Sequence, residues 1–339
     1  MKILISSHRF PPDVGGIESV SLLLAQEFVR SGHVVRLVTQ TPARNPCDFG
    51  FEVIRRPQPR QLLDLMRWCD LYFQNNISLQ ALWPLSIVRR PWVVAHHTWL
   101  RDASGKITLP ARIKLWLLRY ASSISVSEAI AKHIDRPSVA IGNPYREDLF
   151  RVMPEIDRDR DLVFLGRLVS DKGADLLIDA LALLQKEQLR PNATIVGAGP
   201  EADPLKAQVQ RLGLQHQVEF VGVKTGEELV RCLNRHTIVA IPSRWAEPFG
   251  LVALEGIACG CVAVGSAAGG LKDAIGPCGV TFPNGDAVAL ARQLANLLRQ
   301  PEALSQYRER APEHLARHQR DRVAKAYLQV FEEALCQFS

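Results

Sequence analysis

The sequence predicts an α/β protein with two doubly wound parallel sheets, one in each half of the chain. Three observations support this prediction. Short apolar runs alternate with amphipathic stretches, the connections between them are short, and a stretch rich in Pro, Asp and Arg, residues 143–161, separates two such series. Short loops between alternating strands and helices indicate parallel sheets. The length of 339 residues fits two domains of about 150 residues each.

The first half begins with a strand, a helix and a second strand. The glycine pair Gly15-Gly16 leads into a helix expected over residues 18–30, which stops at Gly32. We expect a first domain over residues 1–145 and a linker over 146–160. The strands expected in this domain cover residues 2–6, 33–39, 51–55, 70–73, 92–95, 123–125 and 138–141.

The second half repeats the alternation over residues 161–318. Helices are expected at 174–184, 203–212 and 226–234, and strands at 162–165, 193–196, 218–221, 238–241, 261–264 and 280–282. A last helix, within residues 319–339, is expected to pack back on the first domain. Ligands of such folds bind beyond the carboxyl ends of the strands, so we expect the two domains to face each other across a cleft.

Composition indicates a soluble, cytoplasmic globular protein, because 47% of the residues are hydrophobic, 22% are charged, and no signal peptide or spanning segment is found. Seven cysteines without a regular spacing are interpreted as reduced core residues. The net charge of +6 is concentrated in residues 1–150, where 19 Lys and Arg face 12 Asp and Glu. This basic half suits an anionic substrate or membrane surface, whereas the absence of a nucleic-acid module argues against nucleic acid.

Residues 243–255, SRWAEPFGLVALE, place two carboxylates on either side of an expected helix start. Glu247 precedes the helix, Pro248 favours its first turn, and Glu255 lies within it. Between them, unpaired amides at the helix N-terminus form an anion site. An anion flanked by two carboxylates that can bind hydroxyl groups fits a nucleotide sugar, in which a diphosphate joins a sugar to a ribose.

The second half also carries two cations at the expected carboxyl edge of its sheet. Arg167 and Lys172 lie in the segment FLGRLVSDKG, residues 164–173, after the first strand of that half. Two cations at this edge suit a diphosphate. Alone, they are equally consistent with solvated loop residues. The next strand ends in VGAGP, residues 196–200, whose glycines are expected to let a ligand approach the backbone.

The first half offers two elements on the corresponding side of its sheet. Gly15-Gly16 can bring bare backbone close to a phosphate or sugar, but it is not the GxGxxG fingerprint of dinucleotide-binding enzymes. His96 and His97 end an apolar strand, and because side chains alternate only one of them can face the cleft. We favour His97, although a structural histidine is as common at such a position.

These elements together resemble a known family. Gly15-Gly16, His97, GRLVSDKG, VGAGP, the segment PSRWAEPFGLVALE and Gly269-Gly270 occur in the order and spacing of retaining glycosyltransferases of the GT-B fold, family 4. The resemblance covers essentially the whole chain, and the spacing of the two glutamates is similar to the family's E-x7-E motif. It implies two Rossmann-like domains, an N-terminal acceptor domain and a C-terminal donor domain.

The resemblance implies transfer of a hexose from a nucleoside-diphosphate sugar, UDP-glucose or a close relative, with no cofactor and no metal ion. The implied catalytic residues are Glu247, His97, Arg167 and Lys172. Glu247 would bind hydroxyls of the hexose and Glu255 those of the ribose. The base would lie near residues 222–224. The donor site as a whole would comprise Gly15, Gly16, Gly166, Arg167, Lys172, Gly222, Val223, Lys224, Glu247, Phe249, Gly250, Leu251 and Glu255.

Two other functions are weighed against this one. A nucleotide-sugar 2-epimerase of the same fold lacks the E-x7-E helix, so Glu247 and Glu255 argue against it. A homologue that binds nucleotide sugars without catalysis is disfavoured because Arg167 and Lys172 are also present. Retention of configuration needs a carboxylate nucleophile or a front-face route, and the sequence does not decide between them.

The acceptor is expected to be a glycan or a lipid-linked saccharide. The segment IKLWLLRY, residues 113–120, mixes basic residues with an apolar face, which suits peripheral contact with the inner face of an anionic membrane. The alternative is a helix whose apolar face packs on the core, and we prefer this alternative.

Overall fold

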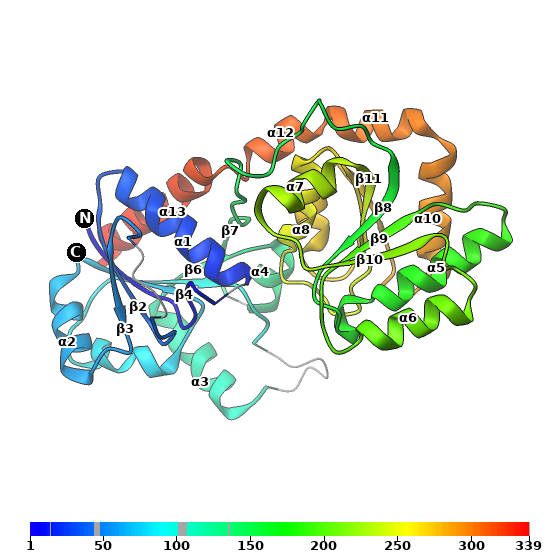
Figure 1. The fold of residues 1–339 in the computed structure, drawn as a ribbon. Helices are drawn as coiled ribbons and strands as arrows, with labels where there is room; N and C mark the ends of the chain where they lie inside the picture. The colour runs from blue at the N-terminus through cyan, green and yellow to red at the C-terminus, as the bar shows by residue number, and fades with distance from the viewer. Residues whose placement is uncertain (14, 44–47, 101–106, 135, 339) are drawn as a thin grey trace. The chain divides into compact units, whose positions relative to one another are not determined.

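The computed structural model describes residues 1–13, 15–43, 48–100, 107–134 and 136–338. The chain divides into two compact units (Figure 1). Unit 1 comprises Met1–Pro144 and His318–Ser339, and unit 2 comprises Tyr145–Arg317. The expected linker, residues 146–160, belongs to unit 2. The first strand of that unit begins at Arg160, which is the last residue of the expected linker.

Unit 1 is built on a parallel sheet in the order β3-β2-β1-β4-β5-β6-β7. The order reverses between β1 and β4, which is the point where folds of this class bind ligands. Every residue of β4 and β5 is buried, as expected for central strands covered on both faces. The strands are β1 Lys2–Ser6, β2 Val34–Thr39, β3 Glu52–Arg55, β4 Leu71–Asn75, β5 Trp92–His96, β6 Ser122–Ser125 and β7 Val139–Ala140.

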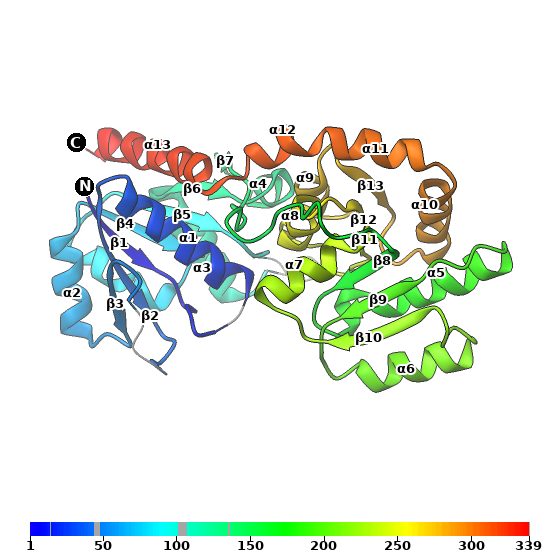
Figure 2. The same ribbon diagram turned by 45° about the horizontal axis from the view of Figure 1, so that its top comes forward.

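The helices of unit 1 include the last helix of the chain. α13 lies alongside α1 (Figure 2), and its rings pack on those of the sheet and α1: the ring centroids of Phe28 and Phe331 are 5.3 Å apart, and those of Phe73 and Tyr327 are 5.8 Å apart. The helices are α1 Gly16–Arg30, α2 Pro59–Trp68, α3 Leu109–Leu117, α4 Glu128–Ile134 and α13 Arg320–Phe338, with 3-10 turns at 79–81, 83–86 and 118–120.

Unit 2 contains a second parallel sheet, in the order β10-β9-β8-β11-β12-β13, which reverses between β8 and β11. The central strands β8 and β11 pair in register from Ile238 opposite Leu162 to Ala240 opposite Phe164. The strands are β8 Arg160–Leu165, β9 Ala193–Val196, β10 Val218–Gly222, β11 His236–Ile241, β12 Val262–Ser266 and β13 Gly279–Phe282.

Helices cover both faces of this sheet. α5, α6 and α10 bury one face in a large apolar cluster that includes Phe164, Leu181 and Leu290. α8 packs on the other face so closely that a Cβ atom on Gly256 would lie 2.6 Å from Val239 Cγ1. The helices are α5 Ala174–Lys186, α6 Ala202–Arg211, α7 Gly226–Asn234, α8 Leu251–Ala258, α9 Leu271–Ile275, α10 Ala287–Arg299, α11 Pro301–Glu309 and α12 Ala311–Ala316, with a 3-10 turn at 170–172.

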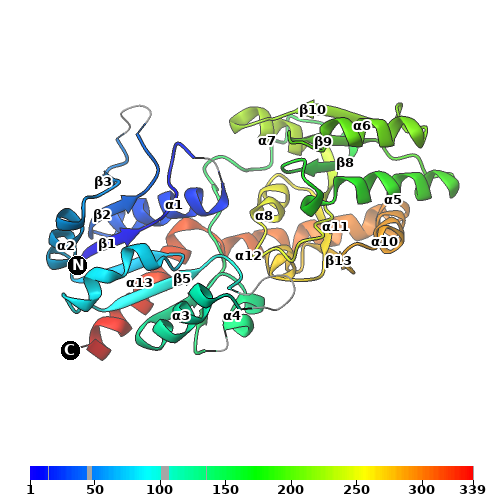
Figure 3. The same ribbon diagram turned by 90° about the horizontal axis from the view of Figure 1, so that it is seen from below.

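Two sequence-based expectations about helices are wrong. Pro248 does not start a helix, because Gly250 adopts a left-handed conformation with φ of 107° and α8 begins only at Leu251. The expected packing of the apolar face of residues 113–120 on the core is also wrong for most of that face. Leu118 is buried, but the side chains of Ile113, Trp116 and Tyr120, on α3 (labelled in Figure 3) and the turn after it, are 43%, 52% and 65% exposed.

No helix in the described ranges is both long enough and apolar enough to cross a membrane.

Candidate functional site

The sequence-predicted residues of unit 2 collect along one edge of its sheet. Parallel strands end at the same edge, so the loops after β8, β9, β10 and β11 are neighbours there. The loop after β8 carries Gly166, Arg167 and Lys172, and the loop after β11 carries Glu247 and leads into α8. Segments more than 70 residues apart in the sequence therefore form one site.

An ion pair between Lys172 and Glu247 lies at the centre of this edge. Lys172 Nζ is 2.5 Å from Glu247 Oε1, and Ser243 Oγ donates to the same oxygen over 2.8 Å. The two side chains are 29% and 13% exposed, so the pair is largely buried but still accessible to a ligand. The other carboxylate oxygen of Glu247, Oε2, accepts no hydrogen bond from the described residues.

The backbone around Glu247 is fixed by the glycines that follow β12. Gly270 N donates to Glu247 O over 2.7 Å, and Gly269 forms an isolated β-bridge with Glu247. Gly269 has φ of 84°, and a Cβ atom there would lie 2.3 Å from Glu247 O. Only glycine fits such a contact, so the Gly269-Gly270 pair is a support for the carboxylate.

Lys172 is positioned by the turn before α5. It ends a 3-10 turn, and Gly173 follows with φ of 67°, where a Cβ atom would meet Pro242 O at 2.0 Å. The close approach of Gly173 to Pro242 brings the loop after β8 against the loop after β11. This backbone contact places Lys172 within reach of Glu247.

Arg167 is exposed, and its side chain forms no hydrogen bond or ion pair with any described residue. Its loop is nevertheless held in place, because Leu168 N donates to Ala198 O over 2.9 Å. The guanidinium is therefore an available cation on an ordered loop.

The glycines of VGAGP pack closely against the loop after β8. A Cβ atom on Gly197 would lie 1.8 Å from Gly166 O, and one on Gly199 would lie 2.3 Å from Leu168 O. The backbone of the Arg167 loop fills the space beside both glycines. The Cβ side of both glycines is therefore taken by the neighbouring loop, and the approach of a ligand to their backbone stays a prediction.

The N-terminus of α8 presents unpaired backbone amides at the same edge. Phe249 is buried, and Gly250 and Leu251 follow it. The N–H groups of Gly250 and Leu251 donate to no described residue, whereas Ala253 N donates to Gly250 O. Free amides at a helix N-terminus, together with the helix dipole, attract anions.

Glu255 lies one turn inside α8 and is only partly accessible. Burial raises the pKa of the Glu255 carboxyl to about 7. Its side chain has no hydrogen-bond or ion-pair partner among the described residues. A poorly solvated carboxylate without a partner is costly, so a ligand that donates hydroxyl groups to it would be stabilising.

Residues 222–224 lie at the end of the edge strand β10. Gly222 has φ of 70° and carries no side chain. The side chain of Val223 is exposed. Lys224 forms an ion pair with Glu228 on α7, which raises the pKa of the lysine. The segment offers an apolar surface and backbone groups, and its cation is already paired.

His97, a predicted site residue of unit 1, belongs to a hydrogen-bonded network within that unit. His97 directly follows β5 and is buried, and its Nε2 lies 2.6 Å from Asn75 Oδ1 at the end of β4. Asn75 Nδ2 donates to Ser21 Oγ on α1, and Ser21 Oγ lies 2.9 Å from Ser7 Oγ. Because the amide oxygen can only accept, Nε2 of His97 carries the proton and Nδ1 is left as an acceptor.

Burial lowers the pKa of His97 to about 4 and that of His96 to about 3, so both rings are neutral at physiological pH. His96 faces β6, with Nε2 at 3.2 Å from Ser123 Oγ. The two consecutive histidines therefore bond to different neighbouring strands, and the expectation that only His97 faces the cleft stays a prediction.

The glycine pair of unit 1 is shaped by a side chain that the sequence analysis did not single out. A Cβ atom on Gly15 would lie 2.4 Å from Glu18 Oε2, and the Glu18 side chain is buried. Gly15 thus lies against the carboxylate of Glu18 at the start of α1. Asn75 and Ser21 were also missed, because strand and helix patterns give no sign of which polar residues will meet.

The cysteines in the described part of the chain are free thiols. Burial raises the pKa of Cys261 to about 12, which agrees with a reduced core residue. Cys47 lies outside the described residues. Within the described ranges, no group of three or more His, Cys, Asp or Glu side chains could hold a metal ion.

The chain matches known proteins in sequence and in fold. Residues 146–314 match the family model described as glycosyl transferases group 1. An uncharacterized glycosyltransferase of Methanocaldococcus jannaschii is 37% identical over 331 aligned residues, which cover 81% of this chain and 83% of that protein. A glycogen synthase of Mycobacterium tuberculosis is 35% identical over 375 aligned residues, which cover 92% of this chain and 89% of that protein. The crystal structure of Anabaena HepE in complex with UDP and glucose has a TM-score of 0.80 and 22% identity, covering 98% of this chain and 100% of that one.

Proposed function

The chain belongs to the group 1 glycosyl transferases, and we propose that it is a retaining enzyme that transfers a hexose from a nucleoside-diphosphate sugar to an acceptor hydroxyl. We further propose UDP-glucose or a close relative as the donor. The observation that carries the proposal is the ion pair of Lys172 and Glu247 beside the free amides of α8. The UDP and glucose bound by Anabaena HepE, which shares the fold, support the choice of donor.

In this proposal the donor diphosphate binds to Arg167, Lys172 and the amides of Gly250 and Leu251. Negative charge grows on the diphosphate as the bond to the sugar breaks, so these groups stabilise the transition state more than the bound substrate. They also neutralise the diphosphate without a metal ion. Metal independence is therefore part of the proposal.

The two glutamates bind the two hydroxyl-bearing ends of the donor. Glu247 accepts hydrogen bonds from the hexose through Oε2, the oxygen that Lys172 and Ser243 leave free. Glu255 accepts hydrogen bonds from the ribose hydroxyls, which supply the donors that its carboxylate lacks. His97 contributes a neutral ring whose Nδ1 accepts a hydrogen bond from a sugar hydroxyl, while Gly15 and Gly16 provide backbone groups. The nucleobase of the donor lies near residues 222–224.

For retention of configuration we favour the front-face route. Glu247 is a poor nucleophile, because one of its oxygens is already held by Lys172 and Ser243. The bond from the anomeric carbon to the leaving phosphate breaks, the acceptor oxygen bonds on the same face, and its proton passes to the leaving phosphate oxygen. No further acid or base is needed for the proton balance.

We also propose that unit 1 contacts the surface of an anionic membrane on the cytoplasmic side, where a lipid-linked saccharide could serve as acceptor. Leu109, Ile113, Trp116 and Tyr120 form an exposed apolar stripe on α3 and the turn after it, with exposed fractions from 43% to 69%. Arg119 lies over the rings of Trp116 and Tyr120. An apolar stripe with adjacent cations suits the boundary between lipid headgroups and acyl chains.

The experiment that tests the donor proposal is nucleotide release by the purified protein from a panel of nucleoside-diphosphate sugars, with and without EDTA. We expect release from a UDP-hexose, unchanged by EDTA. Release from no donor would refute the transferase proposal, and complete loss with EDTA would refute metal independence. Formation of a C2-epimerised sugar in place of a glycoside would favour the epimerase.

A further inference from the structure

Two adjoining cavities open at the carboxyl edge of the unit 1 sheet. The first has a volume of about 180 Å³ and the second about 360 Å³, and they share His8, Ser78 and Gln80 in their walls. His8 follows β1, and Ser78 and Gln80 follow β4, so the cavities lie where the strand order reverses. This is the position at which a doubly wound sheet binds its ligand.

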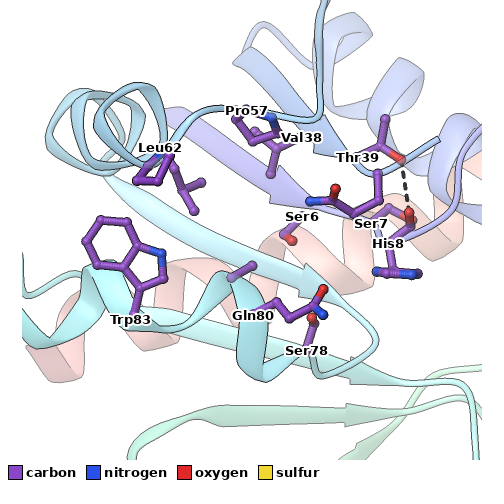
Figure 4. A pocket seen from close by; sticks show the side chains of 13 residues that line it. Ser6, Ser7, His8, Val38, Thr39, Pro57, Leu62, Ser78, Gln80 and Trp83 are labelled. Atoms are coloured by element: carbon purple, nitrogen blue, oxygen red, sulfur yellow. Dashed lines mark hydrogen bonds between the residues drawn. The ribbon is translucent and has the colours of Figure 1, made fainter. Parts of the chain in front are cut away.

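The first cavity has one apolar wall and one polar wall. Figure 4 shows Trp83, Leu62 and Val38 on one side and Ser78, Gln80 and His8 on the other. Among the described residues, the side chains of Ser78, Gln80 and His8 make no hydrogen bond, so their polar groups are available to a ligand.

A sugar or polyol ring matches this combination of walls. Its C–H face can pack on an indole, and its hydroxyl groups can pair with a serine hydroxyl and a glutamine amide, which both donate and accept. A purely apolar ligand would leave the polar wall unpaired, which is costly.

The second cavity adds a single positive charge. Lys114 of α3 lines it together with His8 and Gln80, and no Asp or Glu of the described part of the chain lines either cavity. Lys114 is partly buried and forms no ion pair with a described residue. Loss of hydration lowers its pKa, and no described carboxylate in the cavity wall offsets this loss with a negative charge. An anionic ligand would supply that charge.

The first cavity is also connected to His97. Ser7 lines it and lies 2.9 Å, oxygen to oxygen, from Ser21, which accepts from Asn75, the hydrogen-bond partner of His97. The same hydrogen bonds thus fix one wall of the cavity and the orientation of the histidine.

We propose that these two cavities bind the acceptor, and that the acceptor is a saccharide or polyol that carries a phosphate group. The ring occupies the first cavity between Trp83 and Gln80, and the phosphate lies at Lys114 in the second. The assignment of this ligand as acceptor rests on the proposed transferase function, whereas the site itself does not.

Binding of small probes to the whole protein, measured by titration calorimetry, tests the site without a donor. Matched pairs are compared, glucose with its 1- and 6-phosphates and inositol with its 1-phosphate, and inorganic phosphate is titrated alone. We expect at least one phosphorylated probe to bind about tenfold more tightly than its neutral partner, as for a charge-assisted hydrogen bond. Inorganic phosphate should bind more weakly than that probe, because it has no ring.

Variants assign the effect to the two cavities. Lys114→Met should remove the advantage of the phosphorylated probe, Lys114→Arg should keep most of it, and Gln80→Ala should weaken both members of the pair. Lys132→Met, which removes an exposed lysine from α4 of the same unit, is the matched control and should change nothing. If no phosphorylated probe binds better than its neutral partner, or if Lys114→Met leaves the advantage intact, the proposal is overturned.

A further arm distinguishes a soluble from a lipid source of the phosphate. Dihexanoyl phosphatidylinositol is titrated as single molecules, next to inositol 1-phosphate. Tighter binding of the lipid, still dependent on Lys114, indicates a lipid-linked acceptor, and equal binding indicates a soluble one. UDP is titrated in parallel. If UDP binds and no phosphorylated probe binds, this inference alone is overturned. If a phosphorylated probe binds and UDP does not, the donor proposal alone is overturned.

Discussion

Replacement of Lys172 by alanine is the most direct test of the donor site. The substitution removes the ammonium group that lies 2.5 Å from Glu247 Oε1 and leaves that carboxylate next to the negative diphosphate. We expect kcat to fall, because the lysine acts on charge that develops as the phosphate leaves.

The size of the effect follows from the kind of interaction that is lost. Removal of one positioned donor to a developing anion costs about 2.7–4 kcal/mol. At about 1.36 kcal/mol for each factor of ten, kcat should fall by about 100- to 1,000-fold. The fold should survive, because a partly exposed ion pair contributes about 0–1 kcal/mol to stability. For a protein with domains of this size, that corresponds to a shift in Tm of about 2–4 °C at most.

The assay is steady-state release of UDP from the best donor of the panel, with Tm measured on the same samples. Lys206→Ala is the matched control, because Lys206 is an exposed lysine of α6 in unit 2 that pairs with Asp203 at 3.6 Å and not with Glu247. Lys172→Arg should recover part of the rate by restoring the charge. A kcat for Lys172→Ala close to that of the control would refute the assignment of the diphosphate to this loop.

Three other predictions concern binding, stability and membrane contact. The ionised Glu255 carboxylate accepts hydrogen bonds from ribose hydroxyls better than the protonated form does. Because the group ionises near pH 7, the affinity for UDP-glucose, measured by titration calorimetry, should rise about tenfold from pH 6 to 8. Glu255→Gln should abolish this pH dependence. Gly197→Ala should lower Tm far more than Gly213→Ala, because a Cβ atom meets Gly166 O at 1.8 Å in the first case and no atom within 4 Å in the second. Equal shifts in Tm would contradict the packing argument. Trp116→Ser should weaken sedimentation with phosphatidylglycerol vesicles without changing UDP release, whereas Val288→Ser, at an exposed apolar residue of unit 2, should leave sedimentation unchanged.

Much of the fold was predictable because its signals are local. Each strand of the two sheets begins within two residues of its expected start, since apolar runs bounded by glycine and polar residues define strands without reference to tertiary contacts. The exceptions have physical causes. Pro248 is compatible with a helix start, but the left-handed backbone of Gly250 ends the loop two residues later. The apolar residues of α3 predict burial, and only the packing of the helix decides which of them are covered.

The candidate site was predictable in its composition and not in its contacts. Arg167, Lys172, Glu247 and Glu255 could be selected because the carboxyl ends of parallel strands meet. The ion pair of Lys172 with Glu247 could not be anticipated, since it depends on the backbone contact of Gly173 with Pro242.

The sequence by itself determined the two parallel sheets, the loops that carry the charged residues and the family to which the chain is similar, because these depend on periodicity and on spacing along the chain. Only the tertiary structure decided which polar groups are paired and which are free. It gave His97 a partner in Asn75, and among the described residues it left Glu255 without one and set Lys114 in a cavity that no carboxylate lines. Pairing and hydration depend on distances between residues far apart in the chain, and a linear pattern does not contain those distances.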